Sequence, residues 1–440
     1  ILRRTGCKFG GRITVSLGKT YFAHETACID TDCEISASWR FARVMNIAVI
    51  GGGIMGLALA ARVVKAGHSV TVYEASDQLG GLSTHHNFGA FVWDRFYHVI
   101  LPSDLNLIGF VDALGLKNQL CWQATSTGYY ANSRFYPLSN NYDFLRFPLL
   151  SPISKLRMAF TVLYGSRLND WRKLEQVSCE AWLRRVSGDR VFEQFWRPLL
   201  LAKLGEHYKR VSAVFIWAYI KRLASARDPS IGKEQLGHVR GGYHTVINAV
   251  ASKISAEGNV RLGVSVKEIA PMADGRLSVL TDTDNVGFDR VLFTGPTPVL
   301  KRIVKPELLG GETKAGNVEY LGVVCVTVVS KREISPFYVL NIADETSPFT
   351  GVIGMSNAVP VEETAGYYLT YFPTYLLSSD PRMNSSDEEV IGVFWPAFER
   401  MFPNFDRNDV VEVIVNRAPV VQPLQVLGYS SLVPTVETRH

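Results

Sequence analysis

The sequence predicts an α/β fold with a doubly wound, Rossmann-like dinucleotide-binding domain, a helical insert and a mixed-sheet α+β domain. Three observations predict it. A β-branched run, Ile47 to Ile50, ends in a glycine-rich turn, and an Ala- and Leu-rich helix and a second strand, Ser69 to Tyr73, follow. Helical patterns then occupy most of 101–238, and strand patterns occupy 318–375. The length of 440 residues suits two or three domains.

The glycine-rich turn has the spacing G-x-G-x-x-G between the first strand and the helix. Gly51 permits the tight turn, Gly53 lets the backbone approach a pyrophosphate, and Gly56 lets the helix pack closely on the strand. The first N–H groups of the helix, around Ile54 and Met55, have no partner within the helix and favour a phosphate. The complete strand–turn–helix–strand unit predicts a bound dinucleotide.

A second acidic and glycine signal follows the second strand. Glu74 ends that strand, where its carboxylate is placed to accept hydrogen bonds from an adenosine ribose, and Gly80-Gly81 follows after five intervening residues. This E-x5-G-G extension resembles the signature of FAD-dependent amine oxidases, protoporphyrinogen oxidases and phytoene-desaturase-type enzymes. Nicotinamide enzymes do not usually carry it. The resemblance implies FAD as the cofactor, with further contacts from Ala75, Leu82 and Ser83.

The resemblance covers roughly residues 46–300 well and 300–434 loosely. Its further segments are Phe91–His98, a loop near the isoalloxazine in these flavoproteins; Trp196–Gly205, in their helical region; Val239–Tyr243, a return to the FAD domain; Val260–Ile269, a strand; and Arg290–Pro296, a closing strand and turn. The resemblance of the segment Val260–Ile269 to a strand of these flavoproteins implies that Val266 contacts adenine through its backbone.

The segment Phe91–His98 supplies the candidate catalytic residues Arg95, Tyr97 and His98, with Asp94 beside them. His98 suits proton transfer or a bond to substrate, and it equally suits a structural role at a strand–loop junction. No metal-ligand or nucleophile–base pattern is visible. A flavin needs little from the protein beyond positioning, electrostatics and exclusion of water.

A second aromatic segment reads G-Y-Y-L-T-Y-F-P-T-Y, from Gly366 to Tyr375. If it is an extended strand, one face carries Tyr367, Leu369, Tyr371 and Tyr375, and the other carries Tyr368. Pro373 is a residue that can break this alternation. The face suits an aromatic-lined substrate pocket or ordinary sheet packing.

These patterns divide the chain as follows. We expect a discontinuous FAD-binding domain over 45–100 and 239–300, a helical region over 101–238, and a substrate-domain sheet over 301–440. Residues 1–44 show no clear period and are expected to be an extension before a natural start at Met45. The family's C-terminal FAD-binding element is not recognisable, so we expect it to be missing. Expected helix caps and ends are Ser103 and Gly115, and Ser178 and Gly188.

Charge is unevenly distributed over the chain. The formal net charge is +5, but residues 146–227 hold sixteen Lys and Arg against six Asp and Glu. This excess suits an anionic small-molecule substrate or peripheral contact with an anionic membrane, and it also suits solvated helix faces. We expect no nucleic-acid partner. No apolar run reaches the roughly 18 residues of a membrane span, and six scattered cysteines favour a cytoplasmic location.

The favoured function is an FAD-dependent oxidoreductase that transfers a hydride from an organic substrate to flavin N5. Amine-oxidase relatives usually have Arg or Lys after the second glycine pair, where this chain has Leu82. This departure weakens an amine-oxidase assignment. It leaves open a flavoenzyme without net redox change, resembling UDP-galactopyranose mutases. The missing C-terminal element leaves open a non-enzymatic or truncated flavin-binding protein.

Overall fold

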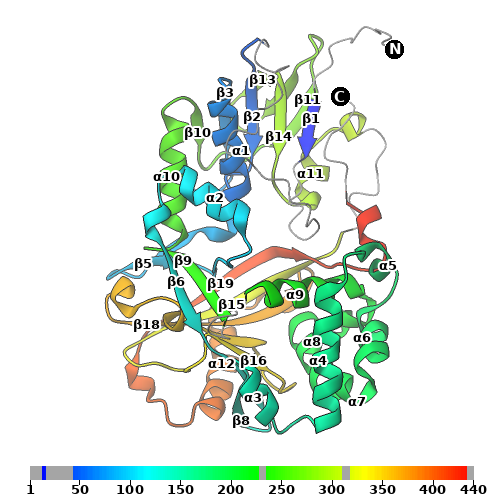
Figure 1. Cartoon of the computed structure of the whole chain (residues 1–440). Coiled ribbons are helices and arrows are strands. Elements are labelled where there is room, and N and C mark those ends of the chain that lie inside the picture. The colour runs from blue at the N-terminus through cyan, green and yellow to red at the C-terminus, as the bar shows by residue number, and fades with distance from the viewer. Residues whose placement is uncertain (1–11, 16–42, 227–233, 310–317, 434–440) are drawn as a thin grey trace. The chain divides into compact units, whose positions relative to one another are not determined.

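The computed structural model describes residues 12–15, 43–226, 234–309 and 318–433 (Figure 1). The chain divides into two compact units: residues 1–84, 244–318 and 430–440 form the first, and residues 85–243 and 319–429 form the second. The sequence analysis grouped 85–100 and 239–243 with the first unit. They belong to the second because Phe91 and Trp93 pack in its core.

The first unit is built on a five-stranded parallel sheet in the order β1-β14-β2-β3-β10. Helix α1 packs on β2 and β3, and an antiparallel sheet β11-β12-β13 adds to the same unit. Their buried side chains include Ala48, Tyr73 and Phe293. The elements are β1 (Arg12–Val15), β2 (Asn46–Ile50), α1 (Ile54–Lys65), β3 (Ser69–Tyr73), α10 (Tyr243–Ser255), β10 (Asn259–Arg261), β11 (Glu268–Pro271), β12 (Leu277–Leu280), β13 (Asn285–Phe288), β14 (Arg290–Phe293) and α11 (Thr297–Ile303).

Two expectations for this unit need correction. The segment Val260–Ile269 is not one strand: β10 ends at Arg261, Gly263 adopts a φ of +66°, and β11 begins at Glu268. Arg12–Val15, expected to lack structure, forms β1, which pairs with β14 in parallel. Most of the predicted extension over 1–44, and residues 434–440 at the other end, lie outside the described residues.

The second unit is built on a seven-stranded mixed sheet in the order β19-β15-β18-β17-β16-β7-β8. All neighbours are antiparallel except β16 and β7. Hairpin β4-β5 and pair β6-β9 complete its strands. They are β4 (His85–Asn87), β5 (Val92–Asp94), β6 (Leu120–Thr125), β7 (Thr127–Ala131), β8 (Arg134–Pro137), β9 (Glu234–Val239), β15 (Tyr320–Ser330), β16 (Val339–Ile342), β17 (Gly351–Gly354), β18 (Tyr368–Leu377) and β19 (Val410–Pro423).

The alternation predicted for the tyrosine segment is confirmed. Leu369 and Tyr371 are buried on one face of β18 with Tyr367 and Tyr375 packed beside them, while Phe372 points to the other face against α12. Pro373 does not interrupt the strand: it lies opposite Cys325 of β15, and its carbonyl accepts a hydrogen bond from the N–H of Thr350 at 2.8 Å. Both faces of this part of the sheet are therefore covered.

The helices of the second unit, apart from α12, lie in the predicted helical region, which also contains four strands that were not predicted, β6 to β9. Ser178 caps α6 as expected, and Gly188 follows it with a φ of +84°. Ser103 does not cap α2; Asp104 occupies that position. The helices are α2 (Leu105–Ala113), α3 (Asn141–Arg146), α4 (Pro152–Arg167), α5 (Trp171–Glu175), α6 (Cys179–Ser187), α7 (Asp189–Val191), α8 (Arg197–Leu204), α9 (Ala213–Ala226) and α12 (Asp387–Met401).

Candidate functional site

The turn between β2 and α1 is held by contacts that only glycine permits. Gly51 has a φ of +106°, and its N–H donates to the carbonyl of Tyr73 at 2.9 Å. A Cβ on Gly56 would lie 1.9 Å from the carbonyl oxygen of Gly51. The hydroxyl of Thr294, at the end of β14, donates toward the carbonyls of Ile50 and Gly51 at 3.0 and 3.1 Å. The start of α1 is therefore drawn tightly onto the sheet.

The second glycine pair packs directly on the first turn. The N–H of Gly80 donates to the carbonyl of Gly52 at 2.9 Å, and Gly53 and Gly80 form an isolated parallel bridge. A Cβ on Gly81 would lie 3.3 Å from the Cα of Gly53. Two stretches of bare backbone thus meet beside the start of α1. Together they form a glycine cradle, Gly51–Gly53 with Gly80–Gly81, that a phosphate group can approach closely.

Glu74 is held at the edge of this cradle. One oxygen of its carboxylate accepts from the N–H of Gly52 at 2.7 Å, and the other accepts from the N–H and hydroxyl of Ser76, both at 2.9 Å. A carboxylate offers about four lone-pair sites, so acceptor capacity remains for a ribose. Glu74 was predicted to bind the ribose; in the structure it also ties together the two ends of the motif.

The other predicted cofactor residues lie around the cradle. Ile54 and Met55 begin α1, and Met55 is exposed. Ala75 is exposed after β3. Leu82 and Ser83 belong to a short 3-10 turn in which Leu82 is exposed and Ser83 is buried.

Val266 lies in the connection between β10 and β11 rather than in a strand. The preceding residues run beside the glutamate: the N–H of Val264 donates to the carbonyl of Glu74 at 2.9 Å. Val266 is buried, yet its backbone N–H and carbonyl make no hydrogen bond within the described part of the chain. Buried backbone groups rarely stay unpaired, so they fit the edge of an adenine. The bare cradle and this pair of unpaired groups match what FAD requires of this unit.

In the second unit, Asp94 is a buried carboxyl at the end of β5. Its Oδ1 accepts from the backbone N–H of Tyr243 at 2.9 Å, and its own carbonyl accepts from the hydroxyl of Tyr371 at 2.5 Å. Burial raises the pKa of Asp94 to about 8. The side chain is therefore largely protonated at neutral pH, and the backbone carbonyl of Asp94, through Tyr371, joins β5 to β18.

Tyr97 and Tyr375 share a hydrogen bond between their hydroxyl oxygens. Burial, and then the neighbouring Tyr375, raises the pKa of Tyr97 well above its ordinary value. The ring of Tyr97 lies 6.0 Å from that of Tyr371, and both belong to an apolar cluster that includes Val323 and Ile353. The sequence analysis named Tyr97 and Tyr375 separately, but no sequence signal paired them.

His98 and Arg95 flank this pair. The Nδ1 of His98 lies 2.9 Å from the carbonyl of Phe96, which only accepts, so Nδ1 carries the proton and Nε2 is left as an acceptor. Burial lowers the pKa of His98, which favours the neutral ring. The Nε of Arg95 is buried and has no hydrogen-bond partner within the described residues. Arg95 is thus a cation available to an anionic group.

Glu363 makes a contact near this site that was not predicted from the sequence. The carboxylate of Glu363 accepts from the N–H of Gly241 at 2.8 Å and lies 3.0 Å from the Nε2 of buried His238. It therefore fixes the Val239–Tyr243 segment from 122 positions away. Glu363 sits in a V-E-E-T stretch that carries no motif.

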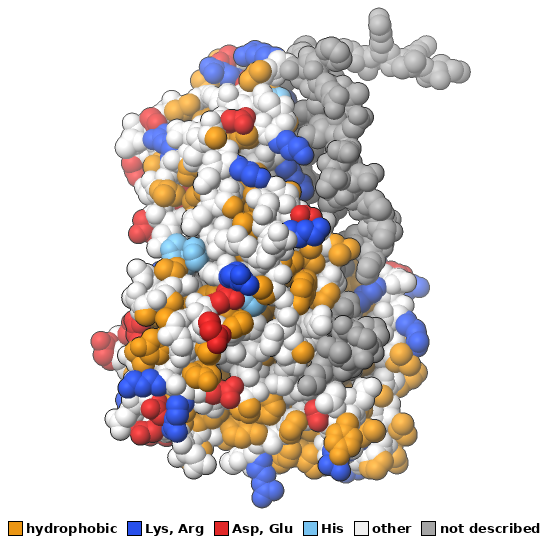
Figure 2. Space-filling view, turned by 60° about the vertical axis from the view of Figure 1, so that its left-hand side comes forward, with side chains coloured by type: hydrophobic (Ala, Val, Ile, Leu, Met, Phe, Trp, Pro, Cys, Tyr) orange, Lys and Arg blue, Asp and Glu red, His pale blue; other side chains and the backbone are white. Residues whose placement is uncertain are grey.

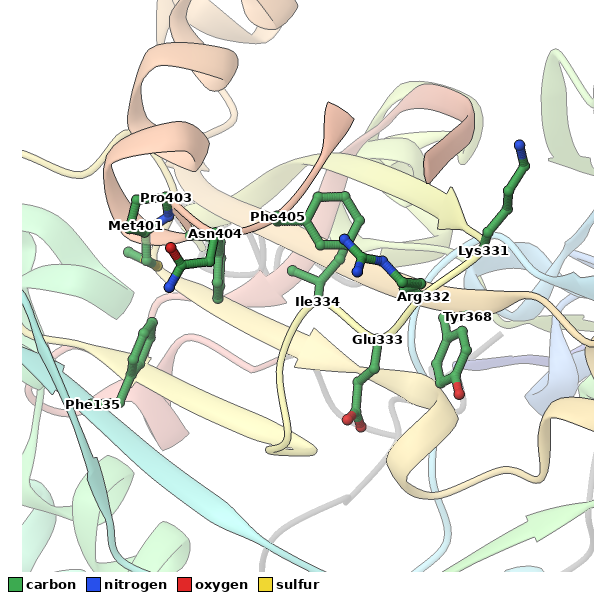
Figure 3. A pocket seen from close by; sticks show the side chains of 11 residues that line it. Phe135, Lys331, Arg332, Glu333, Ile334, Tyr368, Met401, Pro403, Asn404 and Phe405 are labelled. Atoms are coloured by element: carbon green, nitrogen blue, oxygen red, sulfur yellow. The ribbon is translucent and has the colours of Figure 1, made fainter. Parts of the chain in front are cut away.

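A cavity of about 560 Å³ opens on the α12 side of the sheet. Figure 3 shows its wall, where Phe135, Ile334, Tyr368 and Phe405 surround it together with Glu333. Tyr368 faces this cavity, whereas Tyr371 faces the opposite cluster. The cavity is therefore separate from the Asp94 and Tyr97 site. Across the described ranges, no group of His, Cys, Asp and Glu could hold a metal ion.

The model of the flavin containing amine oxidoreductase family matches residues 54–420. The chain belongs to this family. Its members are FAD-dependent oxidoreductases, so the predicted enzyme class and family are confirmed. Within the described residues, no helix is both long and apolar enough to cross a membrane.

Curated relatives in the family are distant. The mitochondrial protoporphyrinogen oxidase of Nicotiana tabacum is 25% identical over 338 residues, which cover 66% of this chain and 66% of that protein. The chloroplastic protoporphyrinogen oxidase 1 of Spinacia oleracea is 24% identical over 299 residues, 60% of this chain and 52% of that protein. The matched part therefore spans about two thirds or less of the length of these relatives.

Solved structures share the fold. A protein of Exiguobacterium sp. 255-15, provisionally assigned as a protoporphyrinogen oxidase, has a TM-score of 0.69 at 19% identity and covers 89% of this chain and 90% of its own. A reduced UDP-galactopyranose mutase has a TM-score of 0.66 at 18% identity, covering 88% and 86%. A putrescine oxidase variant has a TM-score of 0.63 at 19% identity, covering 85% of each. The predicted fold class is confirmed, and the three names span different reactions.

Proposed function

We propose that this chain binds FAD through the glycine cradle and Glu74 and removes a hydride from an organic small molecule. The observation that carries the proposal is the stacking of Gly80–Gly81 on Gly52–Gly53 beside the start of α1. Bare backbone and the free N–H groups of the helix end suit a pyrophosphate, and the unpaired backbone of Val266 suits an adenine edge. Bound FAD supplies the hydride acceptor at N5.

The second unit supports the substrate side of this proposal. The tyrosine face of β18 and Tyr97 offer an aromatic and apolar surface to an organic substrate. Neutral His98 presents Nε2 as an acceptor for a substrate proton, and Arg95 offers a positive charge to an anionic group of the substrate or cofactor. Protonated Asp94 keeps the start of this segment on β18 without adding a negative charge.

The test is a pair of glycine variants on the whole chain. In Gly53→Ala the new Cβ lies 3.9 Å from the Cα of Gly81, so the protein folds, but the methyl group occupies the space in which a phosphate would sit. Gly109→Ala in α2 is the control, because a Cβ there meets nothing within 4 Å. The wild type and the control should show flavin absorbance at about 375 and 450 nm, and Gly53→Ala should lose it. Once flavin has been removed from the wild type, Gly53→Ala and the wild type should have the same unfolding curve, because bound cofactor stabilises only the folded state.

Flavin retained in Gly53→Ala would remove the cradle from the proposal. No flavin in the wild type, even after FAD is added, would overturn the proposal and favour a non-enzymatic chain. Once flavin is bound, loss of the absorbance on anaerobic mixing with a candidate substrate reports hydride transfer.

A flavoenzyme without net redox change is the second candidate. Leu82 stands where an amine oxidase usually has Arg or Lys, and the fold is also that of a UDP-galactopyranose mutase. That reaction class needs a reduced flavin and turns over a nucleotide-sugar with no electron acceptor. Turnover of this kind only after pre-reduction would favour the second candidate, whereas substrate-driven bleaching of oxidised flavin would favour the first.

A further inference from the structure

Helix α4 presents its apolar side to solvent. Its buried residues are Ser154, Thr161 and Gly165, which are small or polar, and Met158, which is large and apolar. The backbone of Gly165 allows close packing, because a Cβ there would lie 3.4 and 3.5 Å from the side chains of Ile220 in α9 and Trp182 in α6. A soluble surface helix has the reverse arrangement, with its large apolar residues toward the core.

The exposed side of α4 carries an apolar stripe with helical spacing. Ile153 and Leu156 are 70% and 73% exposed, and Phe160, Leu163 and Tyr164 continue the same face along the helix. The rings of Phe160 and Tyr164 stack at 5.8 Å. Tyr142 and Leu145 of α3 are also exposed, and we call these seven residues the α3–α4 apolar face. Figure 2 shows hydrophobic side chains gathered at the lower end of the view, where Figure 1 has α3 and α4.

Positive charge outweighs negative charge around this face, where Asp143 of α3 accepts a hydrogen bond from the N–H of Ser139. Residues 144–169 contain Arg146, Lys155, Arg157 and Arg167 and no Asp or Glu. None of these four makes an ion pair within the described part of the chain. Arg146 lies 4.4 Å over the ring of Tyr142, and Lys155 donates to the carbonyl of Leu145. The uncompensated charge is thus concentrated at the apolar face.

In the rest of the basic region, several cations make ion pairs. Arg184 contacts Glu180, Asp189 and Glu193, and Arg210 contacts Glu319. Residues 170–227 hold twelve Lys and Arg and six Asp and Glu, whereas 146–169 hold four Lys and Arg and no acidic residue.

We propose that the α3–α4 apolar face docks on an anionic membrane surface. An apolar stripe bordered by Lys and Arg is the pattern of a helix that lies in the lipid interface, with long basic side chains reaching the headgroups. Sixteen residues of helix extend roughly 24 Å, which suits lying along the interface rather than crossing the bilayer. A second copy of the chain fits less well, because two cationic faces would repel each other.

The test is co-sedimentation of the whole chain with vesicles. Phosphatidylcholine vesicles with about one third phosphatidylglycerol should retain the wild type, and pure phosphatidylcholine should retain much less. The double variant Leu156→Ser/Phe160→Ser should lower the partition coefficient at least about tenfold. Leu105→Ser is the matched control, because Leu105 is 72% exposed on α2, and it should bind like the wild type.

A second variant tests the charges separately. Arg146→Gln/Arg167→Gln should weaken binding to anionic vesicles roughly tenfold or more and should reduce the dependence on salt, because two of the four cations are removed. Wild-type binding that is absent, or unchanged by either double variant, would overturn the proposal. So would a wild-type dimer in sedimentation velocity that Leu156→Ser/Phe160→Ser converts to a monomer, because the face would then cover a second copy. Both variants lie outside the glycine cradle, so retained flavin separates this outcome from a failure of the proposed function.

Discussion

The carboxyl of Asp94 accepts a hydrogen bond from the backbone N–H of Tyr243 at 2.9 Å in a fully buried position. One such bond does not offset the loss of hydration of a carboxylate. The protein therefore favours the protonated acid, and the pKa of Asp94 rises to about 8. A glycine is required opposite it, since a Cβ on Gly242 would lie 3.0 Å from Oδ1.

This burial predicts a pH-dependent stability. Between about pH 4 and about pH 8 the folded state holds a proton on Asp94 that the unfolded state has lost, so Asp94 lowers the free energy of unfolding as pH rises. Asp94→Asn keeps an acceptor for Tyr243 and cannot ionise. Its stability relative to wild type should increase by a few kcal/mol across this range, at about 1.4 kcal/mol per pKa unit before relaxation. Urea unfolding at several pH values measures it, and a constant difference would contradict the prediction.

The Tyr97–Tyr375 hydrogen bond predicts coupled stability effects. Tyr97→Phe or Tyr375→Phe leaves the other buried hydroxyl without this partner, so each should cost about 1–3 kcal/mol in free energy of unfolding. The double variant leaves neither hydroxyl and should cost less than the sum. A double-mutant cycle by urea unfolding measures the coupling. Strictly additive costs would show that the two hydroxyls contribute independently.

Substitution of Glu363 should lower the free energy of unfolding, whereas substitution of the neighbouring Glu362 should leave it nearly unchanged. Glu363→Ala removes the acceptor of the Gly241 N–H and the partner of His238, so the free energy of unfolding should fall by roughly 2 kcal/mol or more. Glu363→Gln retains an oxygen for Gly241 and should cost less. Glu362 is exposed, and Glu362→Ala should change stability by less than about 0.5 kcal/mol. Equal losses in the two alanine variants would contradict a specific role for Glu363.

Local patterns in the sequence predicted the features that depend on neighbouring residues. The β2–α1–β3 unit and the second glycine pair follow from glycine spacing, and the faces of β18 follow from alternation. The strand predicted over Val260–Ile269 was wrong because Gly263 turns the chain, and its glycine was the available signal. Strands β6 and β9 were missed because they pair with each other from opposite ends of the helical region. Strands β7 and β8 form a local hairpin, and Asn132 and Ser133, which adopt positive φ in its turn, were the available signal.

Local sequence patterns could predict only part of the candidate site. Asp94, Tyr97 and His98 stand in one short segment, so the sequence could name them together. Tyr371 and Tyr375, the partners of Asp94 and Tyr97, come from a strand far along the chain. Hydrogen bonds across such separations depend on the register of the mixed sheet, which no local pattern determines. The protonation of Asp94 likewise depends on burial that only the packed structure provides.

Gly56, in the first turn of α1 beside the glycine cradle, should not tolerate a larger residue. In Gly56→Ala the new methyl group would lie 1.9 Å from the carbonyl oxygen of Gly51, and both are backbone positions that cannot turn aside. The first turn of α1 must then shift from β2, so the free energy of unfolding should fall by about 3 kcal/mol and flavin should be lost. Gly392→Ala in α12 meets nothing within 4 Å and should stabilise the helix by about 0.5–1 kcal/mol. Thermal unfolding followed by circular dichroism measures both variants. A Gly56→Ala protein as stable as the wild type would mean that α1 does not need this close contact with the sheet.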